Sequence, residues 1–487
     1  MKNKSFAKNA FFYMCKTLVQ ILFPIITLPY ISRILGVEKI GQYNFATAYV
    51  SYFALIANLG IQTYAVRTGS EIRDDKKQLN AFANEIYTIN VISTIAALLL
   101  LFLILLTSNI LAQYIMLASI LSITIPLTTI GTEWIFNIYE DFTYISIRSM
   151  IFQAASILLM ILFVKKAEDV FIYAFITVMA SAGANILNYK KASGYFEHRI
   201  IISSNLKKHL LPILILFFST IASQIYLNAD VTMLGILKGD YATGLYTAAT
   251  KIYSLARNLM ATIITIILPR FAFWNLNDKE KYLKIGKFVG RGFLGVVLPM
   301  SAGMILLGDK LIGLLCGAEY LPAQGSFKIL CMAFVFSSLG SFIANMALVV
   351  NHEEKTVLIA TIAGACINII GNLIIIPKYS YTGAAFTTLL SEIVVFVIQG
   401  SRAIKYFYMD MEDVIEIVKI FLGVIVLTFS VLSTSRFECN YVLSLCISVV
   451  CGLAGYMLTE VVLNEDFWQG CFKDLHTKAR RKFRYKK

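Results

Sequence analysis

The sequence predicts an all-α polytopic membrane protein with 14 transmembrane helices, arranged as two parallel six-helix bundles and two further C-terminal helices. Three observations lead to this prediction. First, the 487 residues are 58% hydrophobic and only 15% charged, whereas soluble domains are about one quarter charged. Second, Lys and Arg are distributed unequally between alternate connections of the apolar runs. Third, a pattern of small and aromatic residues recurs in the two halves of the chain.

Fourteen apolar runs, separated by clusters of charge, Gly and Pro, are long enough to cross a bilayer at about 20 residues each. They lie at 11–32, 43–66, 87–107, 113–135, 149–164, 170–189, 211–237, 244–268, 286–308, 326–350, 357–376, 383–401, 414–433 and 441–463. The connections are short, which leaves no room for a sizeable soluble domain. The first run continues past Pro24 and Pro29 without a small-residue cleavage site, so we expect an uncleaved first span rather than a signal peptide.

An even number of spans places both chain ends on one side of the membrane. Connections on that side hold 29 Lys and Arg residues, and the opposite connections hold 8. Because basic residues concentrate in cytoplasmic loops, both termini are predicted to be cytoplasmic. The densest basic segments are 190–210, 269–287 and 464–487. Despite the net charge of +14, this distribution favours contact with anionic membrane lipids and argues against nucleic-acid binding.

Two segments related by an offset of 203 residues follow the first and the seventh span. In the first, the matched residues are Gly36, Gly41, Tyr43, Ala46, Thr47 and Ser51; in the second, they are Gly239, Gly244, Tyr246, Ala249, Thr250 and Ser254. Corresponding turns in two blocks of six spans predict parallel bundles with a binding site between them near the midplane. Chance similarity among small residues at membrane turns is the alternative.

The repeat and the charge clusters together predict five parts of the chain. The predicted parts are an N-terminal six-helix bundle (1–190), a cytoplasmic linker (191–210), a C-terminal six-helix bundle (211–403), two extra transmembrane helices (404–463) and a basic cytoplasmic tail (464–487).

Motifs for covalent chemistry are missing from the sequence. Gly286-Lys287 is followed by Phe288 and does not complete a phosphate-binding loop, and the eight cysteines are scattered without a C-x-x-C pair. The four histidines (His198, His209, His352 and His476) fall in predicted cytoplasmic connections, where we expect them to be solvated. The sequence therefore predicts no catalytic residues, no metal and no cofactor, which favours transport over enzymatic activity.

Five charged residues within the spans are candidates for a substrate or ion path, since charge inside a membrane is costly and usually functional. Arg257 lies 13 residues into its span, about 20 Å deep at about 1.5 Å per residue. Asp230 and Lys251 share a depth in one hairpin, so they either form a structural ion pair or handle substrate and ions. Glu392 lies 9 residues into its span. Lys16, about two turns into the first span, either faces the lumen or reaches the cytoplasmic surface.

The repeat does not copy the charges of the second half. Thr27, Ala48 and Ala54 stand at the positions equivalent to Asp230, Lys251 and Arg257. A feature present in one half alone is explained more easily by substrate chemistry than by the fold.

Several motifs resemble the bacterial polysaccharide flippases (the Wzx or O-antigen transporter family) of the multidrug/oligosaccharidyl-lipid/polysaccharide exporter superfamily. The motifs are Pro29-Tyr30-x-x-Arg33-x-Leu35-Gly36-x4-Gly41-x-Tyr43, Leu59-Gly60-x4-Ala65-x-Arg67, Gly244-Leu-Tyr246-x-Ala-Ala249-x-Lys251 and Gly317-Ala-Glu-Tyr320-x-x-Ala323. The resemblance implies a MATE-like fold in the bacterial cytoplasmic membrane. It also implies that an undecaprenyl-diphosphate-linked oligosaccharide moves from the inner to the outer leaflet by ion-coupled alternating access.

The resemblance also implies roles for the charged residues. Arg257, Lys251 and Lys16 would supply a cationic cavity for the diphosphate, and Asp230 or, second, Glu392 would couple transport to H⁺ or Na⁺. Membrane lipids and a glycan polymerase are the expected partners.

Two other functions remain open at this point. One is an ion-coupled multidrug exporter of the same fold. The other is a membrane-embedded glycan polymerase or ligase, which usually needs a large outer loop bearing Arg and His. The longest predicted outer connection, 309–325, has one Lys and no His, which argues against the enzyme.

Overall fold

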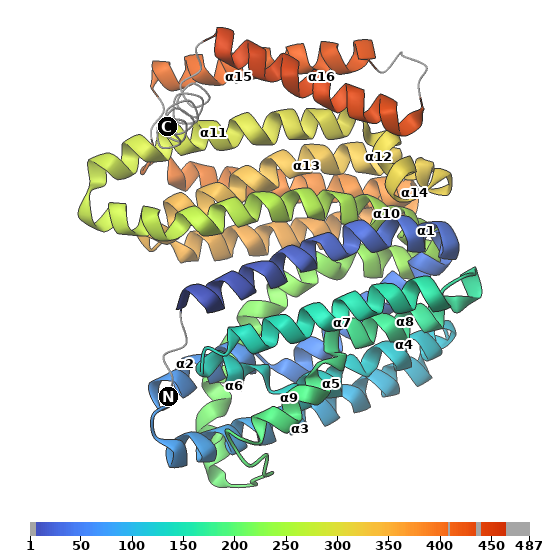
Figure 1. Ribbon diagram of the computed structural model, residues 1–487, viewed down its shortest axis with the longest axis vertical. Coiled ribbons are helices and arrows are strands. Elements are labelled where there is room, and N and C mark those ends of the chain that lie inside the picture. The colour runs from blue at the N-terminus through green and yellow to red at the C-terminus, as the bar shows by residue number, and fades with distance from the viewer. Residues whose placement is uncertain (1–5, 408–409, 435–439, 464–487) are drawn as a thin grey trace, which may run out of the picture. The chain divides into compact units, whose positions relative to one another are not determined.

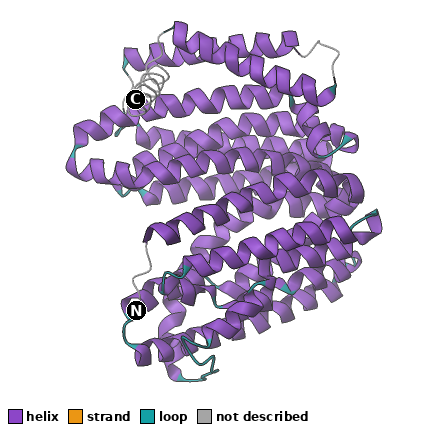
Figure 2. Cartoon of the chain, in the orientation of Figure 1, coloured by secondary structure: helices purple, strands orange, loops and turns teal. Residues whose placement is uncertain are grey.

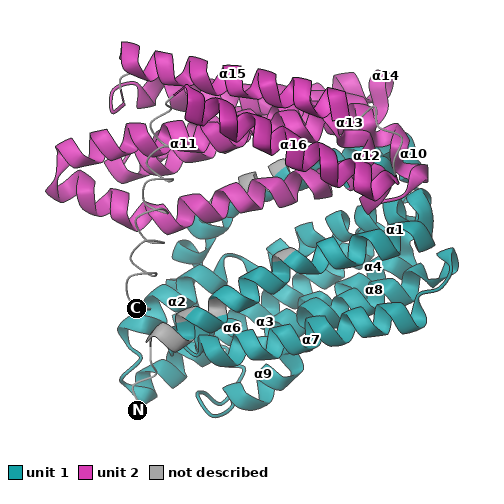
Figure 3. Cartoon of the chain, turned by 45° about the horizontal axis from the view of Figure 1, so that its top comes forward, with its two compact units in different colours: residues 1–247 teal, residues 248–487 magenta. Residues whose placement is uncertain are grey.

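A computed structural model of the protein describes residues 6–407, 410–434 and 440–463. All regular secondary structure in these residues is helical (Figures 1 and 2). The chain divides into two compact units, Met1–Thr247 and Ala248–Lys487 (Figure 3). The boundaries predicted at 190 and 210 stay predictions, and the tail predicted at 464–487 lies outside the described residues.

Unit 1 contains the helices from the N-terminus to the first part of α10. They are α1 (Phe6–Asn58), α2 (Ile61–Glu71), α3 (Lys76–Thr107), η1 (Ala112–Tyr114), α4 (Ile115–Ser122), α5 (Thr124–Gly131), α6 (Glu133–Ile138), α7 (Phe142–Phe163), η2 (Ala167–Asp169), α8 (Val170–Val178), η3 (Met179–Gly183), α9 (Asn185–Ala192), η4 (Ser204–Leu206) and the start of α10 (Lys207–Asn277).

Unit 2 contains the remainder of α10 and all later helices. These are α11 (Lys279–Leu306), α12 (Gly308–Leu315), η5 (Ala318–Ala323), α13 (Gln324–Ile343), η6 (Ala344–Leu348), η7 (Val349–Asn351), α14 (Glu354–Ala403), α15 (Met411–Thr434) and α16 (Tyr441–Val462).

Eleven helical segments of the described chain are long and apolar enough to cross a membrane. Three of them, in α1, α10 and α14, contain a residue with positive φ: Gly36 (72°), Gly239 (79°) and Ser380 (52°). Each of these residues lies in a connection predicted from the sequence. Divided there, the helices allow the fourteen predicted crossings, and the number itself stays a prediction. The predicted fold class, an all-α polytopic membrane protein, is confirmed.

The run predicted as one span at 113–135 is broken into α4, α5 and α6. Pro126 lies in the first turn of α5, where a missing N–H is tolerated. Thr132 then adopts a left-handed conformation, with φ of 40°, between α5 and α6. A β-branched residue rarely takes this conformation, so hydropathy alone does not predict the break. As a consequence, Glu133 begins a separate short helix instead of ending a long one.

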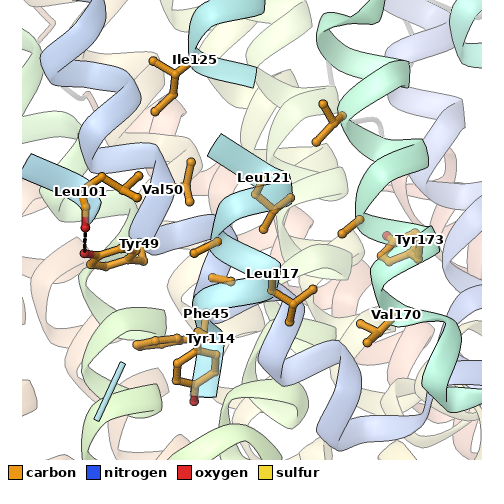
Figure 4. Packing of buried hydrophobic residues seen from close by; sticks show 14 of the residues in the cluster. Phe45, Tyr49, Val50, Leu101, Tyr114, Leu117, Leu121, Ile125, Val170 and Tyr173 are labelled. Atoms are coloured by element: carbon orange, nitrogen blue, oxygen red, sulfur yellow. Dashed lines mark hydrogen bonds between the residues drawn. The ribbon is translucent and has the colours of Figure 1, made fainter. Parts of the chain in front are cut away.

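One of the apolar clusters of unit 1 is formed mainly by residues of α1, α3, α4 and α8 (Figure 4). Phe45 and Tyr49 of α1 pack with Leu101 of α3 and Tyr114 of η1, all buried. The Tyr49 hydroxyl donates to the Leu101 carbonyl oxygen at 3.2 Å. Bonding the polar end of a buried tyrosine in this way avoids the cost of an unsatisfied hydroxyl.

In unit 2, α15 and α16 lie side by side and pack on α11 (Figure 1). Leu307, Leu427 and Tyr456 belong to their common buried cluster, and the Tyr456 hydroxyl donates to the Gly295 carbonyl oxygen at 2.7 Å. Long apolar side chains such as those of Leu422 and Phe429 remain exposed on α15. Lipid is the environment in which such a surface is stable.

Candidate functional site

Lys16, predicted to face the substrate path, pairs with a carboxylate within unit 1. Its Nζ lies 3.4 Å from Glu133 Oε1, and the two side chains are 16% and 37% exposed. The sequence assigned no role to Glu133, because the partner lies 117 residues away. The break at Thr132 positions Glu133 at the start of α6.

Arg148 is a buried cation of unit 1 that was not predicted from the sequence. It lies in α7, and its Nη1 donates to the Ala184 carbonyl oxygen at 3.1 Å. The predicted span began at residue 149, whereas α7 begins at Phe142 directly after Asp141. Asp is a preferred helix N-cap residue, and this signal could have placed Arg148 inside the helix.

Asp230, the first predicted ion-coupling residue, is buried in the unit 1 part of α10. The hydroxyl of the buried Tyr246 donates to its Oδ2. A second pair of polar side chains links α1 and α10 near this carboxylate: the hydroxyls of Tyr52 and Thr232 are 3.1 Å apart. Tyr52 also interacts electrostatically with Asp230. Lys251 belongs to unit 2, so the ion pair predicted between Asp230 and Lys251 stays a prediction.

In unit 2, Arg257 and Glu392 have a common neighbour. Tyr253, buried in α10, interacts electrostatically with Arg257 on the same helix and with Glu392 on α14. Glu392 is buried and Arg257 is half-buried. Two residues predicted separately for substrate binding and for ion coupling are therefore brought into one neighbourhood.

Lys251 lies on a different side of α10 from Arg257. Six residues separate the two, which is about 120° around a helix with 3.6 residues per turn. Cys316, the residue that follows α12, is an electrostatic neighbour of Lys251 in unit 2. A joint contact of Lys251, Arg257 and Lys16 with one substrate stays a prediction.

The repeated glycines form a close crossing within unit 1. A Cβ atom at Gly41 would lie 1.8 Å from the Asp240 carbonyl oxygen, and one at Gly244 would lie 2.1 Å from the Val37 carbonyl oxygen. The offset of 203 relates Gly41 to Gly244 and Val37 to Asp240, so each contact is the repeat of the other. Asn44 and Thr247, also related by this offset, are hydrogen-bonded from Nδ2 to Oγ1 at 2.9 Å.

The expectation that all four histidines are solvated is wrong for His209. This side chain is buried in unit 1, with Nε2 2.8 Å from Glu85 Oε2 and Nδ1 2.8 Å from the Tyr64 hydroxyl. The physical reason is that α10 begins at Lys207, within the predicted linker 191–210, and so carries His209 against α2 and α3. His198 is half-buried in the same linker, and burial lowers its pKa. His352 is exposed, and His476 lies outside the described residues.

A charged cluster joins α11 to the start of α15 in unit 2. Lys287 Nζ lies 2.6 Å from Asp410 Oδ2 and 2.8 Å from Asp413 Oδ2, and Arg291 Nε lies 3.8 Å from Asp413 Oδ1. The hydrogen bond from Lys287 lowers the pKa of Asp410 to about 2. In the part of the chain that the structure describes, no group of three or more His, Cys, Asp or Glu residues could hold a metal ion.

Comparison with known proteins gives matches of both sequence and fold. Residues 6–273 match the family described as polysaccharide biosynthesis protein. A Shigella dysenteriae protein named for O-antigen transport is 24% identical over 79% of this chain and 96% of its own. The Staphylococcus aureus capsular polysaccharide biosynthesis protein CapF is 22% identical over 83% of this chain and 98% of its own.

Among solved structures, the chain is similar to the lipid II flippase MurJ in an inward closed conformation. The TM-score is 0.77 at 16% identity, with 94% of this chain and 99% of the MurJ chain covered. At this level of identity the likeness concerns the fold alone, which is the polytopic helical fold predicted from the sequence.

Proposed function

Because the chain belongs to the polysaccharide biosynthesis protein family, as the sequence resemblance indicates, we propose that it is a flippase for an undecaprenyl-diphosphate-linked oligosaccharide. The substrate would move from the inner to the outer leaflet of the bacterial cytoplasmic membrane and serve cell-surface polysaccharide synthesis. Relatives named for O-antigen transport and capsule biosynthesis, matched over most of their length, support this proposal.

The observation that carries the proposal is the surroundings of Tyr253 inside unit 2, where Arg257 and Glu392 both lie close enough to interact electrostatically with this buried side chain. A glycan and a diphosphate cannot cross hydrocarbon unaided, so the carrier must offer them polar groups at membrane depth. The planar guanidinium of Arg257 suits phosphate oxygens, and Lys251 and Lys16 would add positive charge. This arrangement needs no covalent step, and we propose that the protein is a transporter and not an enzyme.

Replacing Arg257 tests the proposal. Arg257→Ala should abolish surface glycan at near-normal protein abundance, and lipid-linked oligosaccharide should accumulate in the inner leaflet. Arg270→Ala is the matched control, because Arg270 is exposed on the same helix in a predicted cytoplasmic connection. Full glycan export by Arg257→Ala would refute the site. Normal export in cells lacking the protein, together with raised drug sensitivity, would instead identify the multidrug exporter.

Transport needs a direction, and we propose that an ion gradient supplies it through a carboxylate. Asp230 is the first candidate and Glu392 the second; both are buried within apolar helices. A carboxylate inside the membrane is a typical site for a transported or coupling ion, so it can bind H⁺ or Na⁺ in one state and release the ion in another. Asp230→Asn should remove the dependence of reconstituted transport on an imposed gradient.

The proposed orientation places both termini in the cytoplasm. The asymmetry of 29 basic residues against 8 supports it. A reporter active only in the cytoplasm should give signal when fused after residue 200 and none when fused after residue 315. Equal signals would refute this orientation. In this orientation, we propose that the basic cytoplasmic connections contact anionic lipids and that a glycan polymerase is a partner of the protein.

A further inference from the structure

The contact between Lys16 and Glu133 is looser than other lysine–carboxylate pairs of the protein. Nζ and Oε1 are 3.4 Å apart, compared with 2.8 Å for Lys191–Asp141 and 2.6 Å for Lys419–Glu416. A charge-assisted hydrogen bond usually closes to about 2.7–2.9 Å. Glu133 therefore compensates the charge of Lys16 without holding the ammonium group tightly.

Glu133 also acts on a second cation. Glu133 interacts electrostatically with Arg148. The guanidinium group of Arg148 is buried, and its Cζ lies 5.8 Å from the centre of the Tyr144 ring. Nε of Arg148 is buried without a hydrogen-bond partner among the described residues. One carboxylate is thus the neighbour of two cations, contributed by α1 and α7, and its removal would raise the positive charge of this part of unit 1.

A diphosphate could replace this carboxylate. It offers more oxygen atoms and more negative charge than Glu133, so it is the stronger partner for the ammonium group of Lys16. Glu133 is 37% exposed and Lys16 is 16% exposed, so the pair is partly accessible to an incoming anion. In the predicted topology, Lys16 and the end of the run at 113–135 lie near the cytoplasmic surface, from which the substrate would enter.

We propose that Glu133 is the counter-ion that the substrate's diphosphate displaces from Lys16. This inference rests on the proposed flippase function. In the protein without substrate, Glu133 neutralises part of the charge of Lys16. When substrate binds, the carboxylate moves away from Lys16, and it returns when the substrate leaves. Glu133 competes with the substrate and so weakens binding, which permits release in the other state. It is a positioning residue, because it acts through Lys16.

A double-mutant cycle tests this competition with farnesyl diphosphate as the probe and the full-length protein in nanodiscs. Glu133→Gln removes the competitor and should bind the probe about threefold to tenfold more tightly than wild type. Lys16→Met should weaken binding. In the Lys16→Met background, Glu133→Gln should change affinity by less than about twofold, because its competitor role depends on Lys16. The same gain in both backgrounds would overturn the proposal.

Two further variants separate displacement from a structural or general charge effect. Glu140→Gln removes another carboxylate of unit 1, paired with Arg73 at 3.1 Å on the surface, and should leave affinity unchanged. Glu133→Asp keeps the charge and should stay near wild type. An equal gain from Glu140→Gln, or a lower melting temperature of Glu133→Gln at unchanged affinity, would overturn the proposal.

The failure of the flippase function is distinguishable from the failure of this inference. Wild-type protein that does not bind farnesyl diphosphate would refute both. Wild-type protein that binds the probe and flips lipid-linked glycan, with Glu133→Gln binding equally well, would refute the counter-ion alone.

Discussion

Residues 36–51 and 239–254 can be compared position by position, since they are related by an offset of 203. Their backbones agree: Gly36 and Gly239 both have positive φ, and Gly41 and Gly244 make reciprocal contacts with backbone carbonyl groups. Their polar partners differ. The Tyr43 hydroxyl donates to Thr177 Oγ1 at 3.1 Å, whereas the Tyr246 hydroxyl donates to the Asp230 carboxylate. The residues that the repeat shares therefore form the close helix crossing, and a residue that the repeat does not share, Asp230, supplies the charge.

The largest expected effect is on the shared backbone. Gly244→Val places a branched side chain where a Cβ atom would already lie 2.1 Å from the Val37 carbonyl oxygen. Backbone cannot yield as a flexible side chain can, so we expect a loss of about 3 kcal/mol or more and little folded protein. Detergent-extracted protein should be measured by thermal melting and size-exclusion chromatography.

Gly303→Ala is the control for this substitution. Gly303 lies within α11, and a Cβ atom there meets nothing within 4 Å. The free energy of unfolding of Gly303→Ala should differ from that of wild type by less than about 1 kcal/mol, since replacing a helical Gly by Ala is commonly neutral or stabilising. If Gly244→Val melts at the same temperature as Gly303→Ala, the close approach of the two helix turns is not needed for stability, and the role given to the repeated glycines is wrong.

An intermediate effect is expected where the two hairpins differ. Tyr246→Phe removes a donor from a buried carboxylate, while Tyr43→Phe removes a donor from a threonine hydroxyl. A hydrogen bond to a charged group is worth about 1.5–3 kcal/mol and a neutral one about 1 kcal/mol. Tyr246→Phe should therefore destabilise the protein more and reduce gradient-driven transport, and Tyr43→Phe should leave transport close to wild type.

The two Tyr→Phe variants are matched, since each loses one hydroxyl at an equivalent position of the repeat. Thermal melting and flipping of lipid-linked glycan in proteoliposomes, with and without an imposed gradient, would separate stability from coupling. Equal losses of stability and of gradient-driven flipping in both variants would show that the hydrogen bond to Asp230 has no particular role in coupling.

The all-α membrane fold was predictable because hydropathy and glycine placement are local properties. The breaks at Gly36 and Gly239 lie in predicted connections, and Arg257 and Glu392, both predicted from their depth, have Tyr253 as a common neighbour. Long-range geometry was not predictable in this way. The pairing of Lys16 with Glu133 spans 117 residues, and it depends on a left-handed Thr132 that no local preference favours.

The smallest expected effect concerns α15 and α16, which lie outside the repeat. Their link to α11 includes the pair between Lys287 and the exposed Asp410. The pKa of Asp410 is lowered to about 2 by the hydrogen bond from Lys287, compared with about 3.9 for an unperturbed Asp. A lowered pKa contributes stability above the unfolded-state value, and this contribution is lost as pH falls from about 4 to about 2. The effect should be small, because Asp410 is exposed and salt screens it, and because Asp413 also binds Lys287.

Melting temperatures of wild type and Asp410→Asn between pH 5 and about pH 2.5 would measure this contribution. Asp410→Asn should be slightly less stable than wild type at pH 5, and the difference should shrink as the pH falls. Glu412→Gln is the control, since it removes one exposed charge from the start of the same helix and should not alter the slope. If the difference between Asp410→Asn and wild type stays constant across this range, Asp410 does not contribute through its charge, and the helices outside the repeat depend on apolar packing around Tyr456 instead.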